Sequence, residues 1–405
     1  MSDSNTIIYV ISCYPAVSHT FIQQEIAFLR QAGKKVVVAS INNSNIEEMA
    51  KSIEVREEEK NTFYIKEKGV ITAIDALFQY LIFNPVRFFQ ALSFTWKYIR
   101  QTRRSIKYLF GYFGEALLLA RWFSAQNSEQ VHAYFGNVAA TVAMIAKRLQ
   151  PFKLSLSIHG PDIFYDETME GLPIKVQDAD WIRCISFYSQ SQILKHLKIT
   201  EWEKLHIVRM GVDVSKITPL PSTHEKSNNP RKQIVTVGRL VPVKGFSILI
   251  QAIANLKEQG KFFELTLIGS GPERAELEEL AMRLDVVDEI RFKGPLSHHE
   301  TLKHMQHADL FVLATFAEGI PIVLMEAMAM KIPCISTWIN GTPELIRNGI
   351  DGILVAPSDV ISLQNAIAHL SENAELQQKI VQSGRQRIED EYNLEKNTKT
   401  LSSLF

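Results

Sequence analysis

Residues 309–326 read DLFVLATFAEGIPIVLME, an apolar run followed by a turn and a second apolar segment. The first part, 309–314, predicts a buried parallel strand because polar and apolar residues do not alternate in it. The segment after Pro321 predicts a helix, and the first-turn amides of such a helix favour an anion. Two carboxylates, Glu318 in the turn and Glu326 on the helix, are separated by seven residues. This stretch therefore predicts an α/β unit with a binding site at a strand-to-helix turn.

The same order of strand and helix recurs along the chain. Predicted strands cover 234–237, 265–268, 290–292, 310–313, 332–336 and 353–355, and they alternate with helices over 246–258, 273–284, 300–307 and 322–330. The first half of the chain predicts strands at 7–11, 35–39, 130–134, 153–158, 181–185 and 205–208, with a helix at 22–31. This alternation predicts doubly wound parallel sheets, which bind ligands at the carboxyl ends of their strands.

The length of the chain predicts two domains, because 405 residues are too many for one compact core. The polar segment 222–232 contains proline and asparagine without periodicity and predicts a linker. We expect an N-terminal domain over 1–220 and a C-terminal domain over 221–390. A final helix in 391–405 is expected to pack back toward the N-terminal domain.

Charge and cysteine usage restrict the partners and the compartment. The chain carries 44 basic and 44 acidic residues, so its overall field gives no reason to expect a nucleic acid partner. The cysteines, Cys13, Cys184 and Cys334, lack metal-binding spacing and fit a reducing compartment as small buried residues. The N-terminal residues lack a basic region, and the apolar run 7–11 is too short for a signal sequence. We therefore expect a cytoplasmic protein.

A second motif joins another predicted strand to a helix. Residues 238–245 read GRLVPVKG, in which Gly238 permits close backbone approach while Arg239 and Lys244 offer positive charge to a diphosphate. A third turn contains Gly269 and Gly271 but lacks the last glycine of the dinucleotide-binding fingerprint. It predicts a tight turn that lines a nucleotide pocket.

With the carboxylate pair, these motifs resemble the retaining GT-B glycosyltransferases of family 4, the group 1 glycosyltransferases, and in particular members that assemble polysaccharides and exopolysaccharides. The resemblance covers most of the chain. It implies a GT-B fold, in which two Rossmann-like doubly wound α/β domains face each other across a cleft. It also implies transfer of a hexosyl unit, with retention, from a UDP- or GDP-sugar to a glycan or lipid-linked glycan acceptor. No cofactor is implied.

The resemblance also assigns roles to residues of the C-terminal half. Glu318 would contact the donor sugar, Glu326 the ribose hydroxyls, and Arg239 and Lys244 the donor pyrophosphate. Of these, Glu318, Arg239 and Lys244 are expected to take part in catalysis. The donor site would further include Gly238, Gly269, Gly271, Gly319, Ile320 and Pro321.

Two positions depart from glycines that are usual in the family. Asn340 stands at one of them, and asparagine tolerates a left-handed backbone. Lys331 stands where a helix-ending glycine is usual, and a left-handed lysine there costs about 1 kcal/mol. The second departure concerns stability more than catalysis.

The N-terminal half contributes a second set of candidates. His159 follows the strand 153–158 and resembles the histidine of the family's H-G-x-D element, so we expect it to line the donor-sugar pocket and to be catalytic. Asp162 is expected to orient His159 or to cap the next helix. The loop with Tyr14, Ser18 and Thr20 resembles the opening of the polysaccharide-assembly members and is expected, with Asp162, to bind acceptor. A simple helix start capped by Ser18 or Thr20 fits the same letters.

No metal site is expected from the two motifs that suggest one. Residues 178–180 read DAD, the metal-binding D-x-D of another transferase class, but no second acidic site lies nearby. Four histidines lie between 298 and 307 without a cysteine or carboxylate to complete a tetrahedral set. They predict a solvated helix face.

The segment 78–121 differs in composition from the rest. It contains twelve aromatic and seven basic residues but a single acidic one, Glu115. This mixture fits peripheral contact with an anionic membrane, at the inner face of the plasma membrane. It also fits helices packed on the N-terminal sheet with an ordinary basic outer face. No apolar run approaches the roughly 20 residues that span a bilayer.

Two other functions stay open at this point. A nucleotide-sugar epimerase of the same two-domain architecture would need an acid and a base, for which Asp162 and Glu344 are the best pair. A non-catalytic nucleotide-sugar-binding scaffold that stabilises a partner transferase would keep the motifs without turnover.

Overall fold

The computed structural model describes residues 6–16, 20–44, 53–164, 171–220 and 231–405. The chain divides into an N-terminal unit, Met1–Arg209 with Glu395–Phe405, and a C-terminal unit, Met210–Leu394. The division therefore falls at 209/210, before the expected 220/221, and the last residues belong to the N-terminal unit. Most of the expected linker, 222–232, lies outside the described residues.

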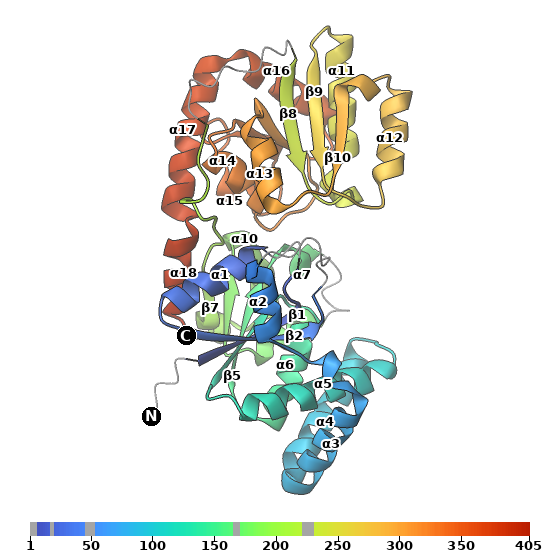
Figure 1. Ribbon diagram of the computed structural model, residues 1–405, viewed down its shortest axis with the longest axis vertical. Helices are drawn as coiled ribbons and strands as arrows, with labels where there is room; N and C mark the ends of the chain where they lie inside the picture. Colours follow the sequence, from blue (N-terminus) through green and yellow to red (C-terminus); the bar gives the residue numbers. More distant parts are fainter. Residues whose placement is uncertain (1–5, 17–19, 45–52, 165–170, 221–230) are drawn as a thin grey trace. The chain divides into compact units, whose positions relative to one another are not determined.

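The N-terminal unit contains a seven-stranded parallel sheet (Figure 1) with the strand order β3-β2-β1-β4-β5-β6-β7. Its strands are β1 (Thr6–Cys13), β2 (Lys35–Asn42), β3 (Thr62–Tyr64), β4 (Gln130–Tyr134), β5 (Lys153–Ile158), β6 (Trp181–Cys184) and β7 (Leu205–Ile207). Its helices are α1 (Thr20–Gln31), α2 (Ile53–Asn61), α3 (Gly69–Phe83), α4 (Pro85–Gln101), α5 (Lys107–Ser124), α6 (Val138–Leu149), α7 (Gly160–Phe164), α9 (Leu172–Asp178), α10 (Phe187–Leu194) and α18 (Leu394–Ser402). The sequence patterns predicted every strand except the short edge strand β3.

Both faces of this sheet are covered, as its alternating side chains require. Ile8 and Val10 of β1 join one core cluster with α4, α5 and α6, whereas Tyr9 and Ile11 join another with α1. Helices α4 and α5 pack on α6, and α3 packs on α4 and α5 (Figure 1). These three helices thus form an additional layer outside the usual α/β/α arrangement.

A buried ion pair fixes α1 to the sheet. Arg183 of β6 contacts Glu25 of α1, with side chains 1% and 2% exposed, and also donates from Nε to the Val208 carbonyl at 2.9 Å. The last residue of the chain lies nearby, because Gln130 donates to the Phe405 carbonyl at 2.6 Å. The Phe405 ring packs against Tyr9, at 6.3 Å between ring centroids. The end of the chain is thus part of the N-terminal unit.

The C-terminal unit contains a six-stranded parallel sheet with the order β10-β9-β8-β11-β12-β13. Its strands are β8 (Lys232–Val237), β9 (Phe263–Ile268), β10 (Ile290–Gly294), β11 (Leu310–Leu313), β12 (Cys334–Thr337) and β13 (Ile353–Val355). Its helices are α11 (Phe246–Glu258), α12 (Arg274–Arg283), α13 (His298–Gln306), α14 (Ile322–Ala329), α15 (Thr342–Leu345), α16 (Val360–Glu372) and α17 (Ala374–Glu391), with a 3₁₀ turn η4 (Pro242–Lys244). The expected doubly wound α/β architecture is confirmed.

Backbone conformation, helix bounds and cysteine burial bear on several of the local predictions. Lys331 and Asn340 both have left-handed backbones, with φ of 59° and 45°, at the two positions where the family usually has glycine. Helix α13 begins at His298, two residues before the predicted start. Cys184 and Cys334 are buried as predicted, but the prediction for Cys13 was wrong, since it is only half-buried.

Candidate active site

The strand order of the C-terminal sheet determines where its loops meet. Strand β8 pairs with β9 on one side and with β11 on the other, so the direction of winding reverses between β8 and β11. At such a switch point the loops that leave the two strands separate and open a crevice at the carboxyl edge of the sheet. The loop 238–245 follows β8, and the loop 314–321 follows β11. Both predicted motifs therefore lie at this switch point.

Lys244 and Glu318 contact each other across the switch point. The Lys244 Nζ atom forms an ion pair with Glu318 Oε1, and the two side chains are 20% and 15% exposed. Backbone hydrogen bonds place them, because the Val243 carbonyl accepts from the Phe316 amide at 2.7 Å and from the Thr315 hydroxyl at 2.9 Å. An ammonium group beside a carboxylate is thus held at the carboxyl edge of the C-terminal sheet.

Two glycines allow the neighbouring loops to touch through their backbones. Gly269, after β9, has φ of 140°, and a Cβ there would lie 1.9 Å from the Gly238 carbonyl oxygen. A Cβ at Gly341 would lie 1.9 Å from the carbonyl oxygen of Gly319. The turn after β9 therefore supports the basic motif from one side, and the turn after β12 supports the carboxylate motif from the other. Gly271, in the same turn as Gly269, likewise allows close contact with the backbone of Leu240.

Glu326 has a partner that the sequence analysis did not assign. It lies in α14 with its side chain 7% exposed, and its Oε1 atom is 2.7 Å from His298 Nε2. His298 is the first residue of α13. The expectation that the histidines 298–307 form a solvated helix face was therefore wrong for His298, which is about one third exposed and holds a site carboxylate.

The pair has an electrostatic consequence for His298. The hydrogen bond with Glu326 raises the pKa of His298 above its ordinary value, against the opposing effect of burial. The contribution of the pair to the free energy of unfolding is therefore complete below the ordinary histidine pKa of about 6.5, and it is lost as the pH rises through the folded value.

We expect Glu326→Gln to lower the pKa of His298 toward its ordinary value, because the amide cannot stabilise an imidazolium as a carboxylate does. The measurement is a chemical-shift titration of the histidine rings by NMR. Glu279→Gln, at an exposed position of α12, is the matched control and should leave this titration unchanged. An unchanged His298 titration in Glu326→Gln would show that the pair does not exist in solution.

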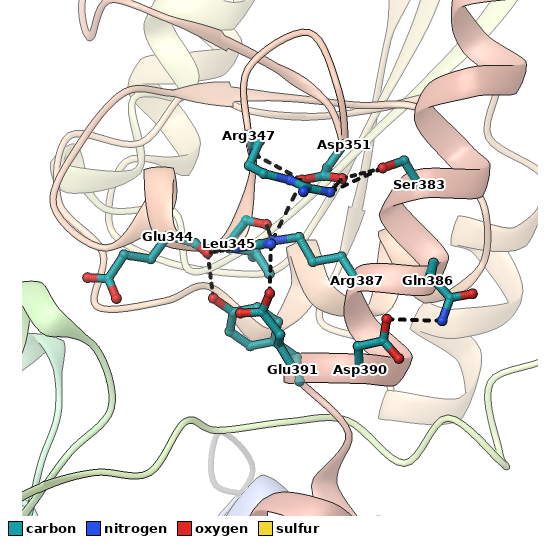
Figure 2. Close-up of polar contacts among 10 residues, drawn as sticks. Glu344, Leu345, Arg347, Asp351, Ser383, Gln386, Arg387, Asp390 and Glu391 are labelled. Carbon is teal, nitrogen blue, oxygen red and sulfur yellow. Dashed lines mark hydrogen bonds and ion pairs between the residues drawn. The ribbon is translucent and has the colours of Figure 1, made fainter.

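Helix α17 donates hydrogen bonds to the backbone of α14 and α15. Figure 2 shows Arg387 of α17 at the backbone of α15, where it donates to the carbonyls of Glu344 at 2.6 Å and Leu345 at 2.8 Å. Arg385, two residues earlier on the same helix, donates to the Ala329 carbonyl at the end of α14 at 2.6 Å. The helix therefore fixes both the segment that follows Gly341 and the helix that carries Glu326.

The buried carboxylate in Figure 2 completes this support. Asp351 accepts hydrogen bonds from Arg347 Nε and from the Ser383 hydroxyl, both at 2.6 Å. Burial would raise the pKa of Asp351, but the hydrogen bonds of Arg347 and Ser383 outweigh it and keep the pKa below its ordinary value. Because Asp351 therefore stays charged, this cluster is a fixed structural contact between α17 and the loop before β13.

The remaining donor-site candidates lie in the same loops. Arg239 follows Gly238 and is exposed, while Ile320 is 5% exposed. Pro321 precedes α14, and its carbonyl accepts from the amides of Leu324 and Met325 at 3.2 and 3.3 Å. The structure thus brings Lys244 and Glu318 into contact and places Arg239 on the same loop as Lys244. The roles of these residues in binding stay predictions.

The N-terminal candidates occupy the corresponding edge of the other sheet. His159 follows β5, is 4% exposed, and stacks on Tyr134 with 4.8 Å between ring centroids. The Asp162 carboxylate accepts a hydrogen bond from the His159 backbone amide at 2.9 Å and so binds the turn that carries His159. Their roles toward a sugar stay predictions.

Two of the three residues expected in the acceptor loop, Tyr14 and Thr20, are among the described residues. The Tyr14 side chain is fully buried, and its hydroxyl donates to Glu58 at 2.9 Å, which is a packing role. Thr20 is the first residue of α1. Ser18 lies outside the described residues. An acceptor role for this loop stays a prediction.

The two aspartates of the D-x-D sequence form ion pairs within the N-terminal unit. Asp178 pairs with Arg148, and Asp180 pairs with Lys147 at 2.8 Å. The Asp180 carboxylate also accepts from the Leu154 amide at 2.6 Å. Among the described residues, no group of three or more His, Cys, Asp or Glu is placed to hold a metal ion.

The C-terminal unit matches a known protein family. Residues 222–387 match the family model described as "Glycosyl transferases group 1". The match covers most of the C-terminal unit, Met210–Leu394. The matched range contains both predicted motifs and the Lys244–Glu318 contact.

Curated relatives carry related names. The chain is 33% identical over 210 residues to the putative colanic acid biosynthesis glycosyltransferase WcaL of Escherichia coli, covering 50% of this chain and 51% of that protein. It is 32% identical over 197 residues to the amylovoran biosynthesis glycosyltransferase AmsK of Erwinia amylovora, covering 47% and 48%. The chain thus spans about half the length of the curated relatives that it matches.

Solved structures share the fold over the whole chain. Sucrose-phosphate synthase from Thermosynechococcus elongatus superposes with a TM-score of 0.75 at 18% identity, covering 98% of both chains. HepE of Anabaena, solved in complex with UDP and glucose, superposes with a TM-score of 0.73 at 17% identity, again over 98% of both chains. At these identities the likeness concerns the fold alone, which is the GT-B fold.

Proposed function

We propose that this protein is a retaining glycosyltransferase that moves a hexosyl unit from a nucleotide diphosphate sugar to a glycan or lipid-linked glycan acceptor. The contact between Lys244 and Glu318 at the switch point carries this proposal. In this contact the Lys244 ammonium, which can bind a diphosphate, lies next to the Glu318 carboxylate, which can bind sugar hydroxyls. A nucleotide diphosphate sugar presents both chemical groups side by side. The names of the relatives support a role in polysaccharide biosynthesis.

Each group has a defined task in the proposed reaction. Lys244 and Arg239 stabilise the negative charge that develops on the leaving diphosphate, together with the first-turn amides of α14. Glu318 accepts hydrogen bonds from the donor sugar, and Glu326, held by His298, accepts them from the ribose diol. The acceptor hydroxyl attacks the anomeric carbon on the face that the diphosphate leaves, and the diphosphate takes its proton.

The proposed donor is a UDP- or GDP-sugar, and the reaction needs no cofactor. UDP is present in the related HepE structure, which supports a nucleoside diphosphate ligand. Two cationic side chains on the loop after β8 supply charge that a divalent metal supplies in other enzymes. We also propose that the reaction takes place at the cytoplasmic face of the plasma membrane, where lipid-linked acceptors are held.

We expect either UDP or GDP, and not ADP, to raise the melting temperature clearly. A ligand at 100 times its dissociation constant stabilises the folded state by about 2.7 kcal/mol. The matching nucleotide sugar should then release nucleoside diphosphate only when a glycan acceptor is added, equally well with and without EDTA. The anomeric configuration of the product, read by NMR, should equal that of the donor.

The same assay separates the other two functions. Conversion of the donor into its epimer without acceptor would identify an epimerase and contradict the transferase. Tight nucleotide-sugar binding without turnover, on acceptors that cell extracts glycosylate, would identify a scaffold. An inverted product would retain the transferase and exclude the proposed stereochemistry.

A further inference from the structure

The outer helical layer of the N-terminal unit exposes an unusual amount of apolar surface. Among the described residues, eleven of the twenty-two exposed large apolar side chains lie between 70 and 110, a tenth of the chain. They are Val70, Ile71, Ile74, Phe78, Ile82, Phe83, Val86, Phe89, Trp96, Ile106 and Phe110, called here the α3–α5 face. Scattered exposed apolar side chains need no explanation, but a concentration of them marks an interaction surface.

The spacing along α3 shows that this face is a continuous stripe. Ile71, Ile74, Phe78 and Ile82 recur every three or four residues, so they lie on one side of the helix. The opposite side is buried through Ala76 and Tyr80, which belong to the core. Helix α3 is therefore apolar on both sides, and the outer side has no covering element within the described chain.

The charge of α3 is correspondingly low. Its one charged residue, Asp75, pairs with Arg121 of α5 at 2.5 Å. A helix with apolar residues on both sides and its charge neutralised is unfavourable at a water-exposed surface. An apolar environment on its outer side would remove this cost.

Basic side chains border the face, whereas acidic ones are nearly absent from it. The segment 78–121 carries seven basic residues and one acidic residue, although the whole chain is balanced. The exposed basic residues of α4, of the turn after it and of α5 are Arg87, Lys97, Arg100, Arg103 and Lys107. The acidic residue, Glu115, is 14% exposed and pairs with Lys66 at 3.8 Å. The border of the face thus presents a net positive charge, which complements an anionic surface.

We propose that the α3–α5 face docks on an anionic lipid bilayer, with α3 lying in the plane of the interface. Phe78, Ile82 and their neighbours would enter the boundary of headgroups and acyl chains, while Lys97 and Arg100 contact lipid phosphates. Helix α3 has 15 residues, about 22 Å, which is shorter than the hydrocarbon core of about 30 Å. None of the described helices is long and apolar enough to cross a membrane.

This inference does not depend on the proposed transferase, since it concerns a different surface and a different ligand. It would nevertheless place the protein beside lipid-linked acceptors. The rival occupant of the face is a second copy of the chain, and the experiment distinguishes it from the bilayer.

The test is co-sedimentation of the full chain with vesicles of phosphatidylglycerol and phosphatidylcholine, compared with phosphatidylcholine alone. The wild-type protein should bind the anionic vesicles more strongly, and added salt should weaken the binding. Phe78→Ser with Ile82→Ser should lower the partition coefficient about tenfold or more, because the apolar contact is lost. Lys97→Glu with Arg100→Glu should abolish the preference for anionic vesicles.

A matched control uses exposed apolar residues elsewhere on the same unit. Ile199→Ser with Trp202→Ser removes side chains that are 76% and 44% exposed and should leave vesicle binding unchanged. A second readout is the fluorescence of Trp96, which should be quenched by brominated lipid in the wild-type protein and not in Trp96→Phe. Circular dichroism checks that each variant is folded.

Three results would overturn the proposal. The first is wild-type protein that does not sediment with anionic vesicles. The second is binding that the Phe78 and Ile82 substitutions leave unchanged. The third is self-association without vesicles that the same substitutions abolish, which would assign the face to a second copy of the chain.

Discussion

Lys244→Ala is expected to lower transferase turnover by about 10²- to 10³-fold, the usual cost of removing one group that stabilises developing charge. The Lys244 ammonium stands at the switch point of the C-terminal sheet and contacts Glu318 there. Its loss leaves the leaving diphosphate with Arg239 and backbone amides only. Initial rates with saturating donor, measured by release of nucleoside diphosphate, give the comparison.

The matched control for this variant is Lys261→Ala. Lys261 also pairs with a glutamate, Glu372, but the two side chains are 35% and 62% exposed and neither residue belongs to the two motifs. Its replacement should leave turnover unchanged. Turnover of Lys244→Ala within a few fold of the wild type, in a folded protein, would remove Lys244 from the mechanism. The double variant with Glu318→Gln should cost less than the sum of the single variants, because the two side chains are in contact.

Gly269→Ala is expected to lower the free energy of unfolding by about 3 kcal/mol and to weaken nucleotide binding. Its φ of 140° is outside the range that side chains permit, and its Cβ would lie 1.9 Å from the Gly238 carbonyl oxygen. The turn after β9 must therefore move, and the basic loop after β8 moves with it. Urea unfolding and calorimetric titration with the stabilising nucleoside diphosphate measure the two effects.

Gly260→Ala separates backbone strain from the contact between the loops. Gly260 has φ of 75°, but nothing lies within 4 Å of the position of its Cβ. This variant should lose only about 1 kcal/mol, the cost of a left-handed alanine, and should bind the nucleotide normally. Equal losses in the two variants would mean that the contact between Gly269 and Gly238 does not support the site.

The sequence predicted most of the C-terminal architecture because its strands are buried and regular. Strand β11 is apolar at all four positions, and its bounds were predicted as observed. Strand β3, in contrast, has only three residues, Thr62–Tyr64, at the edge of the N-terminal sheet. So short an edge strand leaves no periodicity to read.

The sequence indicated that the motifs with Lys244 and Glu318 lie at one edge of a sheet, but it predicted neither their contact nor that of His298 with Glu326. Both motifs lie directly after predicted strands of one parallel sheet, so their place at the carboxyl edge of that sheet was predictable. One signal for His298 was present, because Ser297 and Glu300 form a capping box that begins α13 at His298. The pairing itself joins residues 28 apart on separate helices, which no local pattern specifies.

Local sequence patterns also could not predict the buried pair of Arg183 and Glu25. These residues are 158 positions apart, and each would ordinarily be expected at the surface. Only the assembled sheet shows that α1 covers the face of β6 that carries Arg183. Side-chain roles that depend on distant partners are therefore accessible from the structure alone.

The central claim is that the basic motif and the carboxylate motif of the C-terminal unit hold one nucleotide diphosphate. A crystal structure of the protein with the nucleoside diphosphate that raises its melting temperature tests this most directly. The account predicts the diphosphate at Lys244 and Arg239, beside the first turn of α14, with the ribose hydroxyls on Glu326. A nucleotide bound elsewhere, or a ribose out of reach of Glu326, would contradict it.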